Sequence, residues 1–290
     1  MKVGLSTYSL SRLIKSGEMD IFKAIKWIAE NGGEHAEIVP AGFSFIEDPS
    51  LVKKVAAAAK EAGIALSSYT IAADFIKEET EEFLNSEIER LKKEVAVAAE
   101  LGVRLMRHDA AWRPVEQCTD KNFENDLPKL VRGCAEVARY AKQYGITTSV
   151  ENHGFFVQES RRVQKLVKAV NMDNFKTTLD VGNFICADED PVRAVKNNAP
   201  YASMVHLKDF YLRPKSKNPG DGFANTAGGN FRRGAILGHG DIDIRKQLTI
   251  LAAAGYSGWL SIEFEGLEDP RTGSKTGMDN AKRFLLELGL

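Results

Sequence analysis

Residues 145–153 read Gly-Ile-Thr-Thr-Ser-Val-Glu-Asn-His, and this stretch with its approach contains the repeating unit of the fold. Ile146–Glu151 is short and rich in apolar and β-branched residues, which is typical of a buried strand. Before it, apolar residues recur at helical spacing from Leu130 to Ala141, and Gly145 follows as a stop signal. The stretch therefore predicts a helix, a glycine stop and a strand that ends in a carboxylate.

The same unit recurs along the whole chain. Short apolar segments alternate with amphipathic ones at a spacing of roughly 30 to 40 residues, which is the period of a β-α unit. Strict alternation indicates parallel strands joined by right-handed crossovers. Eight units favour a closed (β/α)8 barrel of the α/β class, forming one domain over residues 1–290, over an open doubly wound sheet. The expected strands are Val3–Tyr8, His35–Val39, Ile64–Tyr69, Val103–His108, Ile146–Glu151, Lys176–Asp180, Ser203–Lys208 and Trp259–Phe264.

Two local features qualify this pattern. Pro128 lies early in a helical segment, and we expect it to bend that helix or delay its start. Residues 213–240, after the seventh strand, are rich in Gly, Asn, Lys and Pro. We expect them to form a long, flexible loop over the C-terminal face of the barrel, where enzymes of this architecture keep their active sites.

Composition and charge disfavour several classes of function. Lys plus Arg number 39 against 40 Asp plus Glu, a net charge of -1, which disfavours non-specific binding to nucleic acid. No apolar run approaches the roughly 20 residues that cross a bilayer, and the start of the chain lacks the apolar core of a signal peptide. The 3 cysteines lack CxxC spacing, which indicates a reducing compartment. We therefore expect a cytoplasmic protein with a small-molecule partner and no membrane or nucleic-acid partner; homo-oligomer formation stays open.

Ionisable residues end the four late strands. Glu151, Asp180, His206 and Glu263 each follow apolar residues at the carboxyl end of a strand, where barrel strands converge. If these groups share one half-buried site, the three carboxylates repel one another and lose hydration, so at least one must protonate unless a counter-charge is present. One divalent cation supplies that charge. Oxygen ligands with one histidine suit Mn²⁺, which we expect, or Mg²⁺, and tolerate Co²⁺ or Zn²⁺. The alternative is four unrelated strand-end residues that make caps and salt bridges.

These residues carry a family resemblance. Over essentially its whole length the chain resembles the sugar phosphate isomerase/epimerase group of xylose isomerase-like TIM barrels. In that group the Glu-Asp-His-Glu quartet binds one divalent metal, so the resemblance implies the same role for the four strand-end residues here. The matching motifs are Ser149-Val150-Glu151-Asn152-His153, Leu179-Asp180-Val181-Gly182-Asn183, Val205-His206-Leu207-Lys208-Asp209, Gly238-His239-Gly240-Asp241-Ile242-Asp243 and Ser261-Ile262-Glu263.

At two points the sequence differs from other members of the superfamily, and these differences limit the functions expected for it. Asn183 stands where the group often has a substrate-contacting histidine; an amide can bond a hydroxyl but cannot shuttle a proton. DNA-repair endonucleases of the superfamily need several further histidine ligands, whereas Tyr69 and Asn183 occupy positions where imidazoles are expected. With the balanced charge, this argues against a nuclease.

The resemblance implies catalytic roles for two of the ligands. Glu151 and Glu263 are expected on opposite faces of the substrate carbon, one removing a proton and the other returning it. Because metal coordination lowers the basicity of a carboxylate, a separate base is a second possibility. Two histidines are candidates for this base: His108, at the end of the fourth strand, and His153, two residues beyond Glu151. The alternative for each is a hydrogen-bonded histidine with a structural role. His35, at the start of the second strand, is expected to be structural.

Six further residues are expected to contact the substrate. Lys208 shares a strand face with His206, Trp112 offers an apolar face to a sugar ring, and arginines can hold a phosphate or carboxylate. Each also has a structural reading, such as a salt bridge or a solvated charge. The expected substrate-binding residues are Asn183, Lys208, Arg107, Trp112, Arg233 and His239.

Together these features predict a divalent-metal-dependent isomerase or epimerase that acts on a sugar or sugar-like polyol through an enediolate. The first rival is a metal-dependent lyase or hydrolase of a keto-sugar derivative such as a 3-keto-glycoside, since the same enolisation permits elimination. A non-catalytic binding barrel and an abasic-site nuclease are the other rivals.

Overall fold

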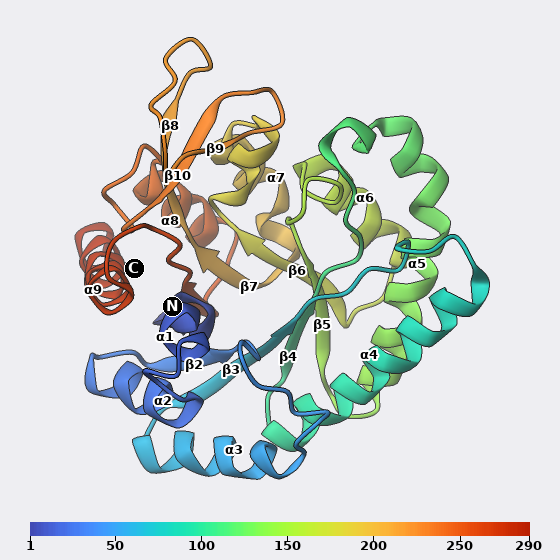
Figure 1. Cartoon of the computed structure of the whole chain (residues 1–290), viewed down its shortest axis with the longest axis horizontal. Helices are drawn as coiled ribbons and strands as arrows, with labels where there is room; N and C mark the ends of the chain where they lie inside the picture. Colours follow the sequence, from blue (N-terminus) through green and yellow to red (C-terminus); the bar gives the residue numbers. More distant parts are fainter.

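Eight parallel strands close into a barrel in the computed structural model, which describes residues 1–290 (Figure 1). Neighbouring strands follow the order β1-β11-β7-β6-β5-β4-β3-β2, so the last strand pairs with the first. All eight segments expected as strands are strands, and the (β/α)8 prediction is confirmed. The barrel strands are β1 Lys2–Ser6, β2 His35–Ile38, β3 Ala65–Ile71, β4 Leu105–His108, β5 Thr147–Glu151, β6 Phe175–Asp180, β7 Ala202–Leu207 and β11 Trp259–Ile262.

Helices surround the barrel and begin and end at the expected signals. Asp190 accepts a hydrogen bond from the N–H of Arg193 with Pro191 next to it, and Gly63 and Gly102 end their helices in the left-handed conformation. The helices are α1 Ser11–Lys15, α2 Ile21–Glu30, α3 Ser50–Ala62, α4 Glu81–Leu101, α5 Asp120–Lys142, α6 Ser160–Val170, α7 Pro191–Asn198, α8 Ile244–Ala253 and α9 Pro270–Leu288.

The expected effect of Pro128 on the helix start is wrong. Helix α5 already begins at Asp120, where the Thr119 side chain accepts a hydrogen bond from the N–H of Asn122. Pro128 therefore lies inside the helix and not at its beginning. The N-cap determines where this helix begins. Pro128 lies in the third turn, where it removes one backbone N–H donor from the helix.

His35 fills a space beside Gly4 near the amino end of the barrel strands. The imidazole of His35 is fully buried, with Nδ1 2.8 Å from the hydroxyl of Ser67 and Nε2 3.1 Å from the carbonyl oxygen of Leu260. A Cβ atom at Gly4 would lie 2.1 Å from the His35 carbonyl oxygen and 2.6 Å from its ring. Glycine on β1 thus makes the space that His35 fills, which is the structural role expected for this histidine.

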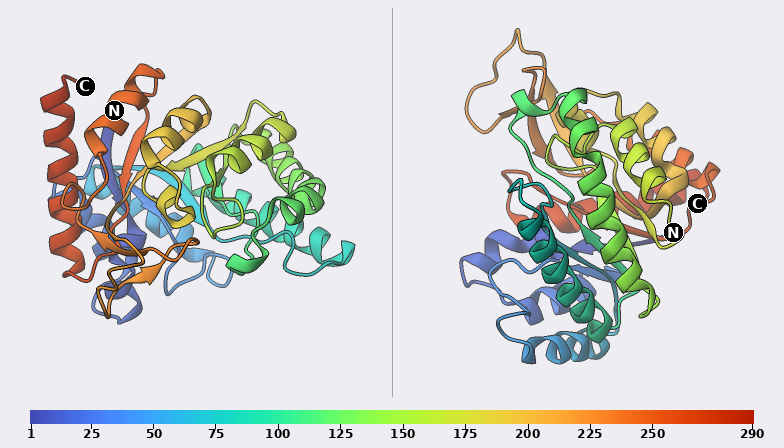
Figure 2. Two further views of the ribbon diagram at one scale, coloured as in Figure 1. Left: turned by 90° about the horizontal axis from the view of Figure 1, so that it is seen from above. Right: turned by 90° about the vertical axis from the view of Figure 1, so that its right-hand side faces the viewer.

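Residues 213–240 are mostly loop, as expected, but short strands within them join the end of the seventh barrel segment in a small sheet. Strands β8 Asp209–Arg213 and β9 Ala224–Asn225 both pair antiparallel with β10 Phe231–Ala235. This sheet projects from the rim of the barrel (Figure 1, top; Figure 2, right). The carboxylate of Asp209 accepts hydrogen bonds from the N–H groups of Gly238, Gly240 and Ile242, so the segment is tied down where it leaves and rejoins the barrel.

The two chain ends lie side by side, as both views in Figure 2 and Figure 1 show. Their proximity follows from closure of the barrel, because β1 pairs with β11 and α9 packs on β1. No helix combines the length and the apolar character that crossing a membrane requires.

Candidate active site

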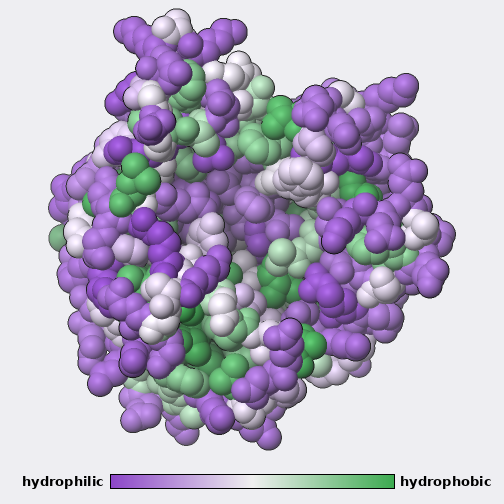
Figure 3. Space-filling view, viewed as in Figure 1, coloured by the Kyte–Doolittle hydropathy of each residue, from purple (hydrophilic) through white to green (hydrophobic).

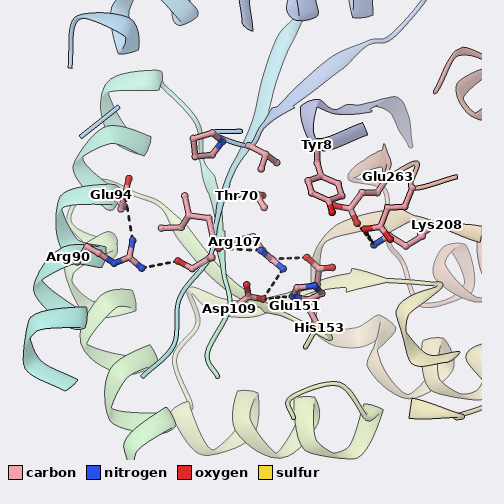
Figure 4. Close-up of a pocket in the computed structure, with 15 residues that line it drawn as sticks. Tyr8, Thr70, Arg90, Glu94, Arg107, Asp109, Glu151, His153, Lys208 and Glu263 are labelled. Carbon is pink, nitrogen blue, oxygen red and sulfur yellow. Dashed lines mark hydrogen bonds and ion pairs between the residues drawn. The ribbon is translucent and has the colours of Figure 1, made fainter. Parts of the chain in front are cut away.

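A cavity of about 390 Å³ opens at the carboxyl end of the barrel strands (Figure 4). Figure 3 looks at this side of the molecule and shows a hollow near its centre, bordered by hydrophilic residues. So many ionisable groups in one concave site are typical of an active site. The charged residues that line the cavity are Arg90, Glu94, Arg107, Asp109, Glu151, His153, Lys208, Glu263 and Glu265.

Four side chains that could hold a metal ion meet beside this cavity. Glu151 and Asp180 end β5 and β6, His206 lies near the end of β7, and Glu263 directly follows β11. One ligand atom from each lies within 4.8 Å of all the others. The structure thus brings together the four residues that the strand-end pattern singled out.

The donor atoms of this quartet fit a divalent cation. His206 Nδ1 lies 3.5 Å from Glu151 Oε2 and 3.8 Å from Glu263 Oε1, so the imidazole faces two carboxylates without a close hydrogen bond to either. His206 Nδ1 and Asp180 Oδ2 are buried atoms without a hydrogen-bond partner. Buried polar atoms that lack partners cost free energy unless something else satisfies them. Three carboxylates and one imidazole are a ligand set that suits Mn²⁺, Mg²⁺ or Zn²⁺.

Glu37 of β2 holds the other nitrogen of His206. Its carboxylate lies 2.9 Å from His206 Nε2 and accepts a hydrogen bond of 2.7 Å from the hydroxyl of Thr70. A shift in register between Ala36 and Glu37 accompanies this placement. Burial lowers the pKa of His206, but Glu37 and Glu151 outweigh burial, so this pKa lies well above its usual value. A carboxylate on one nitrogen fixes the ring so that the other faces the ligand cluster.

Lys208, two residues after His206, neutralises the opposite side of the cluster. Its Nζ atom lies 2.5 Å from Glu263 Oε2, 3.2 Å from Glu265 Oε1 and 3.4 Å from Asp180 Oδ2. Burial raises the pKa of Glu263, and Lys208 offsets this only in part, so the pKa stays above its usual value. Burial likewise keeps the pKa of Asp180 raised. Ion pairs with three carboxylates thus hold the lysine in the site.

A second chain of charges runs along the cavity wall from Glu151 (Figure 4). Arg107 Nε lies 2.7 Å from Glu151 Oε2, and Arg107 Nη2 donates to Asp109 at 2.8 Å. Asp109 Oδ1 in turn lies 3.1 Å from His153 Nδ1. Burial raises the pKa of Glu151, but Arg107 and His206 lower it well below its usual value. Burial lowers the pKa of His153, but Asp109 outweighs it and leaves the pKa raised.

Asn183 links the two halves of the site. Its amide nitrogen donates to Glu151 Oε1 at 3.0 Å, and its amide oxygen accepts from Lys208 Nζ at 3.3 Å. The Asp180 carboxylate accepts hydrogen bonds from the N–H groups of Gly182 and Asn183, which holds this turn against the quartet. The amide thus uses one donor and one acceptor within the site, and its second N–H and second lone pair stay free for a ligand.

The expectation that His108 faces the site is corrected by the structure. His108 has no exposed surface and packs between Phe75 and Phe175, with Nδ1 2.7 Å from the carbonyl oxygen of Asp109. Successive side chains of a strand point to opposite faces, and on β4 the inward position belongs to Arg107. His108 is therefore a core residue that cannot reach a substrate in the cavity.

Two further residues lie outside the cavity. Arg233 stacks on Tyr211 and Phe223, with 4.8 and 5.4 Å from its guanidinium carbon to the ring centroids. His239 is exposed and lines none of the cavities described here. The glycines around His239 explain its motif, because their N–H groups donate to Asp209. A substrate contact of either residue is not supported.

Trp112 and His153 mark the outer part of the site. Trp112 is 59% exposed and borders two neighbouring cavities of about 550 and 220 Å³, both of which also touch His153 and Gly154. The left-handed φ of 75° at Gly154 suits glycine, and this residue lies against the indole. Trp112 is thus available to a ligand that extends beyond the main cavity.

Sequence reasoning missed several residues of the site. Tyr8, Glu37, Asp109 and Glu265 all belong to it, and Glu265 with burial raises the pKa of Tyr8 to about 12. Glu37 carried the same signal as the quartet, because it is an acidic residue near the end of an apolar strand. Asp109 directly follows the end of β4, and Glu265 lies three residues after the end of β11. At such positions the sequence does not say which side chain turns inward.

The sequence also identifies the family. The profile of the xylose isomerase-like TIM barrel family matches residues 25–286. This match covers most of the chain and coincides with the observed closed barrel. The chain belongs to the xylose isomerase-like TIM barrel family.

Known proteins of this family differ in the reaction they catalyse. An inosose dehydratase of Bacillus licheniformis is 26% identical over 251 residues, which cover 81% of this chain and 80% of that protein. The chain spans about half the length of several other curated relatives that it matches, inosose dehydratases among them. The matched relatives thus carry the name of one dehydratase, and the aligned share of their length differs.

Solved structures match the fold closely. The 3-keto-D-glucoside 4-epimerase YcjR of E. coli has a TM-score of 0.72 at 15% identity, covering 98% of this chain and 99% of that one. The IOLI protein, solved with a bound zinc atom, has a TM-score of 0.74 at 18% identity, covering 99% and 97% of the two chains. At this identity the likeness concerns the fold.

Proposed function

We propose that the protein is a divalent-metal-dependent epimerase or isomerase that moves the proton next to the carbonyl group of a sugar-like keto-polyol. One observation carries the proposal. Glu151 and Glu263 line the same cavity but reach it from β5 and from the end of β11, two strands that β6 and β7 separate in the barrel order. Two carboxylates that approach one bound ligand from different strands are suited to act as base and acid of one reaction.

The quartet of Glu151, Asp180, His206 and Glu263 would hold the metal ion. When bound, the ion would polarise the substrate carbonyl and offset the negative charge that develops as the neighbouring proton leaves. Glu37 would keep His206 Nδ1 directed at the ion through its contact with Nε2. This is a role for a carboxylate that does not itself touch the substrate.

The chain's own groups supply the proton transfers. Glu151, ionised through its contact with Arg107, accepts the proton from the substrate carbon on one face. Glu263, beside Lys208, returns a proton on the other face. Removal on one face and return on the other inverts the carbon, whereas return to the adjacent carbon interconverts aldose and ketose. Lys208 and Asn183 are placed to bond substrate hydroxyls along the same wall.

Dehydration is the second candidate reaction. It begins with the same proton abstraction, but a hydroxyl group then leaves with a proton from an acid. His153, half exposed on the cavity wall with its pKa raised by Asp109, is placed to supply that proton. The relative named inosose dehydratase also favours this reaction.

Proton exchange in D₂O tests the proposal and separates the two reactions. The protein is incubated with a divalent metal and with D-fructose, D-tagatose or an inosose, the metal is removed with a chelator, and the products are read by ¹H NMR. An epimerase or isomerase yields a deuterated isomer, whereas a dehydratase yields an unsaturated product with loss of water.

We expect Glu151→Gln and Glu263→Gln each to slow the exchange by about 100-fold or more, the usual contribution of a general base or acid. Glu136→Gln, on the exposed face of α5, serves as the matched control and should leave the rate unchanged. Exchange that survives both site substitutions, or that needs no metal, would contradict the proposal.

A further inference from the structure

Three arginines line the cavities around the quartet, and one of them lacks an acidic partner. Arg90 bonds Glu87 through two nitrogens, and Arg107 contacts Glu151 and Asp109. Arg232 makes no ion pair, since no carboxylate oxygen lies within 4.0 Å of its guanidinium, and its buried Nε atom has no hydrogen-bond partner. A partly buried cation without a partner is costly unless an anion completes its site.

The three-stranded sheet fixes the position of Arg232. The residue lies on β10 opposite Leu212 of β8, and its guanidinium lies over the ring of Phe210, 5.2 Å from the centroid. Phe210 is two residues from Leu212 and so shares its face of the sheet. Stacking on a ring occupies the flat face of a guanidinium and leaves its N–H edge for a ligand.

Arg232 lines a cavity of about 220 Å³ that adjoins the quartet. Asn183 and Lys208 line the same cavity, and both also contact ligands of the quartet, Glu151 and Glu263. A molecule whose carbonyl end reaches the quartet can therefore extend past Asn183 and Lys208 toward Arg232. The outer wall of this cavity includes Trp112.

The neighbouring arginine provides an internal comparison. Arg233 follows Arg232 on β10 and so points to the other face, where it stacks on Tyr211 and Phe223 and lies outside this cavity. Both residues carry the same charge on the same strand. They differ in the face of the sheet on which they lie, and Arg233 Nη2 also lies 3.9 Å from Glu268 Oε1. A comparison of the two therefore tests the position of Arg232 while the net charge changes equally.

We propose that Arg232 binds an anionic group of the substrate, so that the substrate is a keto-sugar with a phosphate or carboxylate remote from its carbonyl group. This inference rests on the proposed function for the location of the carbonyl end. The planar fork of an arginine matches the two oxygens that a phosphate or a carboxylate presents. Arg232, unlike Arg90 or Arg107, makes no ion pair with a side chain of the protein, although Glu265 lines the same cavity.

Calorimetric titration of the full-length, metal-loaded protein tests the inference. The probes are D-fructose, D-fructose 6-phosphate and 5-keto-D-gluconate, which offer no anion, a phosphate and a carboxylate. We expect at least one charged probe to bind about tenfold or more tightly than fructose, the effect of a charge-assisted contact. The probe that gains most identifies the anion.

Substitutions assign the gain to one residue. Arg232→Gln should abolish the preference for the charged probe and leave fructose binding unchanged, Arg232→Lys should retain part of it, and Arg233→Gln should retain all of it. Equal binding of all three probes, or a preference that survives Arg232→Gln, would overturn the inference. The two proposals can fail separately. If the protein exchanges the proton of fructose in D₂O but binds all three probes equally, the proposed function stands and the role of Arg232 is refuted.

Discussion

Two buried histidines lie at opposite ends of the same barrel and differ in their partners. His35 near the amino end and His206 near the carboxyl end both have 0% of their surface exposed. His35 bonds a hydroxyl and a carbonyl oxygen, whereas His206 lies among Glu37, Glu151 and Glu263. Two equally buried histidines therefore differ in protonation, because the charge of the neighbouring groups differs.

The difference is visible in the direction of each pKa. Burial lowers the pKa of His35 to about 4, because hydrogen bonds and the charges of Glu37 and Glu34 offset the loss of hydration only in part. Around His206 the carboxylates reverse the sign of the shift. Neutral hydrogen-bond partners thus leave one imidazole uncharged in the core, whereas carboxylate partners favour positive charge at the other, which a proton or a metal ion can supply.

Removing the imidazole at the carboxyl end should have the largest effect. We expect His206→Asn to weaken metal binding by at least about 100-fold, because each of four ligands carries on the order of a quarter of a binding free energy of about 10 to 16 kcal/mol. Titration calorimetry with Mn²⁺ and Zn²⁺ measures the loss, and the thermal stabilisation that metal gives the parent protein should also disappear. Undiminished affinity would mean that the imidazole is not a ligand.

Changing the partner of His206 instead of His206 itself should cost less. We expect Glu37→Gln to lower metal affinity by about 10- to 100-fold, the usual effect of removing a carboxylate that orients a ligand. Glu34→Gln is the matched control, because Glu34 bonds the N–H of Val3 and has no contact with His206. The comparison fails if the two variants bind metal equally well.

The amino-end histidine should affect stability and not metal affinity. Its folded pKa of about 4 lies below the unfolded value of 6.5, so its contribution is present above about pH 6.5 and is lost as the pH falls toward 4. Between about pH 7 and about pH 5 this amounts to about 2 kcal/mol of unfolding free energy.

Urea unfolding at several pH values checks this effect. His35→Gln should flatten the pH dependence relative to the parent protein, whereas the exposed His239→Gln should retain it. A variant at position 35 that keeps the full slope would show that other groups cause it.

The fold and the quartet could be predicted from the sequence because both rest on periodic signals. Helix stops, caps and apolar segments recur with each unit, and convergence of strand ends follows from the barrel itself. Glu37 carried an equivalent strand-end signal, but its partner His206 is 169 residues away and is reached across the barrel. Spacing along the chain does not indicate such a pairing.

Two of the errors in the site share one physical origin, which is the choice between adjacent residues on a strand. On β4, Arg107 faces inward where His108 was expected, and on β10, Arg232 borders the cavity where Arg233 was expected. A shift of one residue exchanges the two faces of a strand. Barrel strands are buried on both faces, so apolar alternation does not reveal which side chain turns inward.

The clasp at Asp209 makes the projecting sheet an exchangeable cassette for protein engineering. Its carboxylate joins the start of β8 to the segment after β10, and a Cβ at Gly240 would lie 2.2 Å from Asp209 Oδ1, so the junction depends on these two residues and not on the tip. The far end of the sheet has a second attachment, because Thr226, Gly228 and Asn230 donate to the carboxylate of Asp188. An exchange of residues 214–223 would therefore leave both attachments in place.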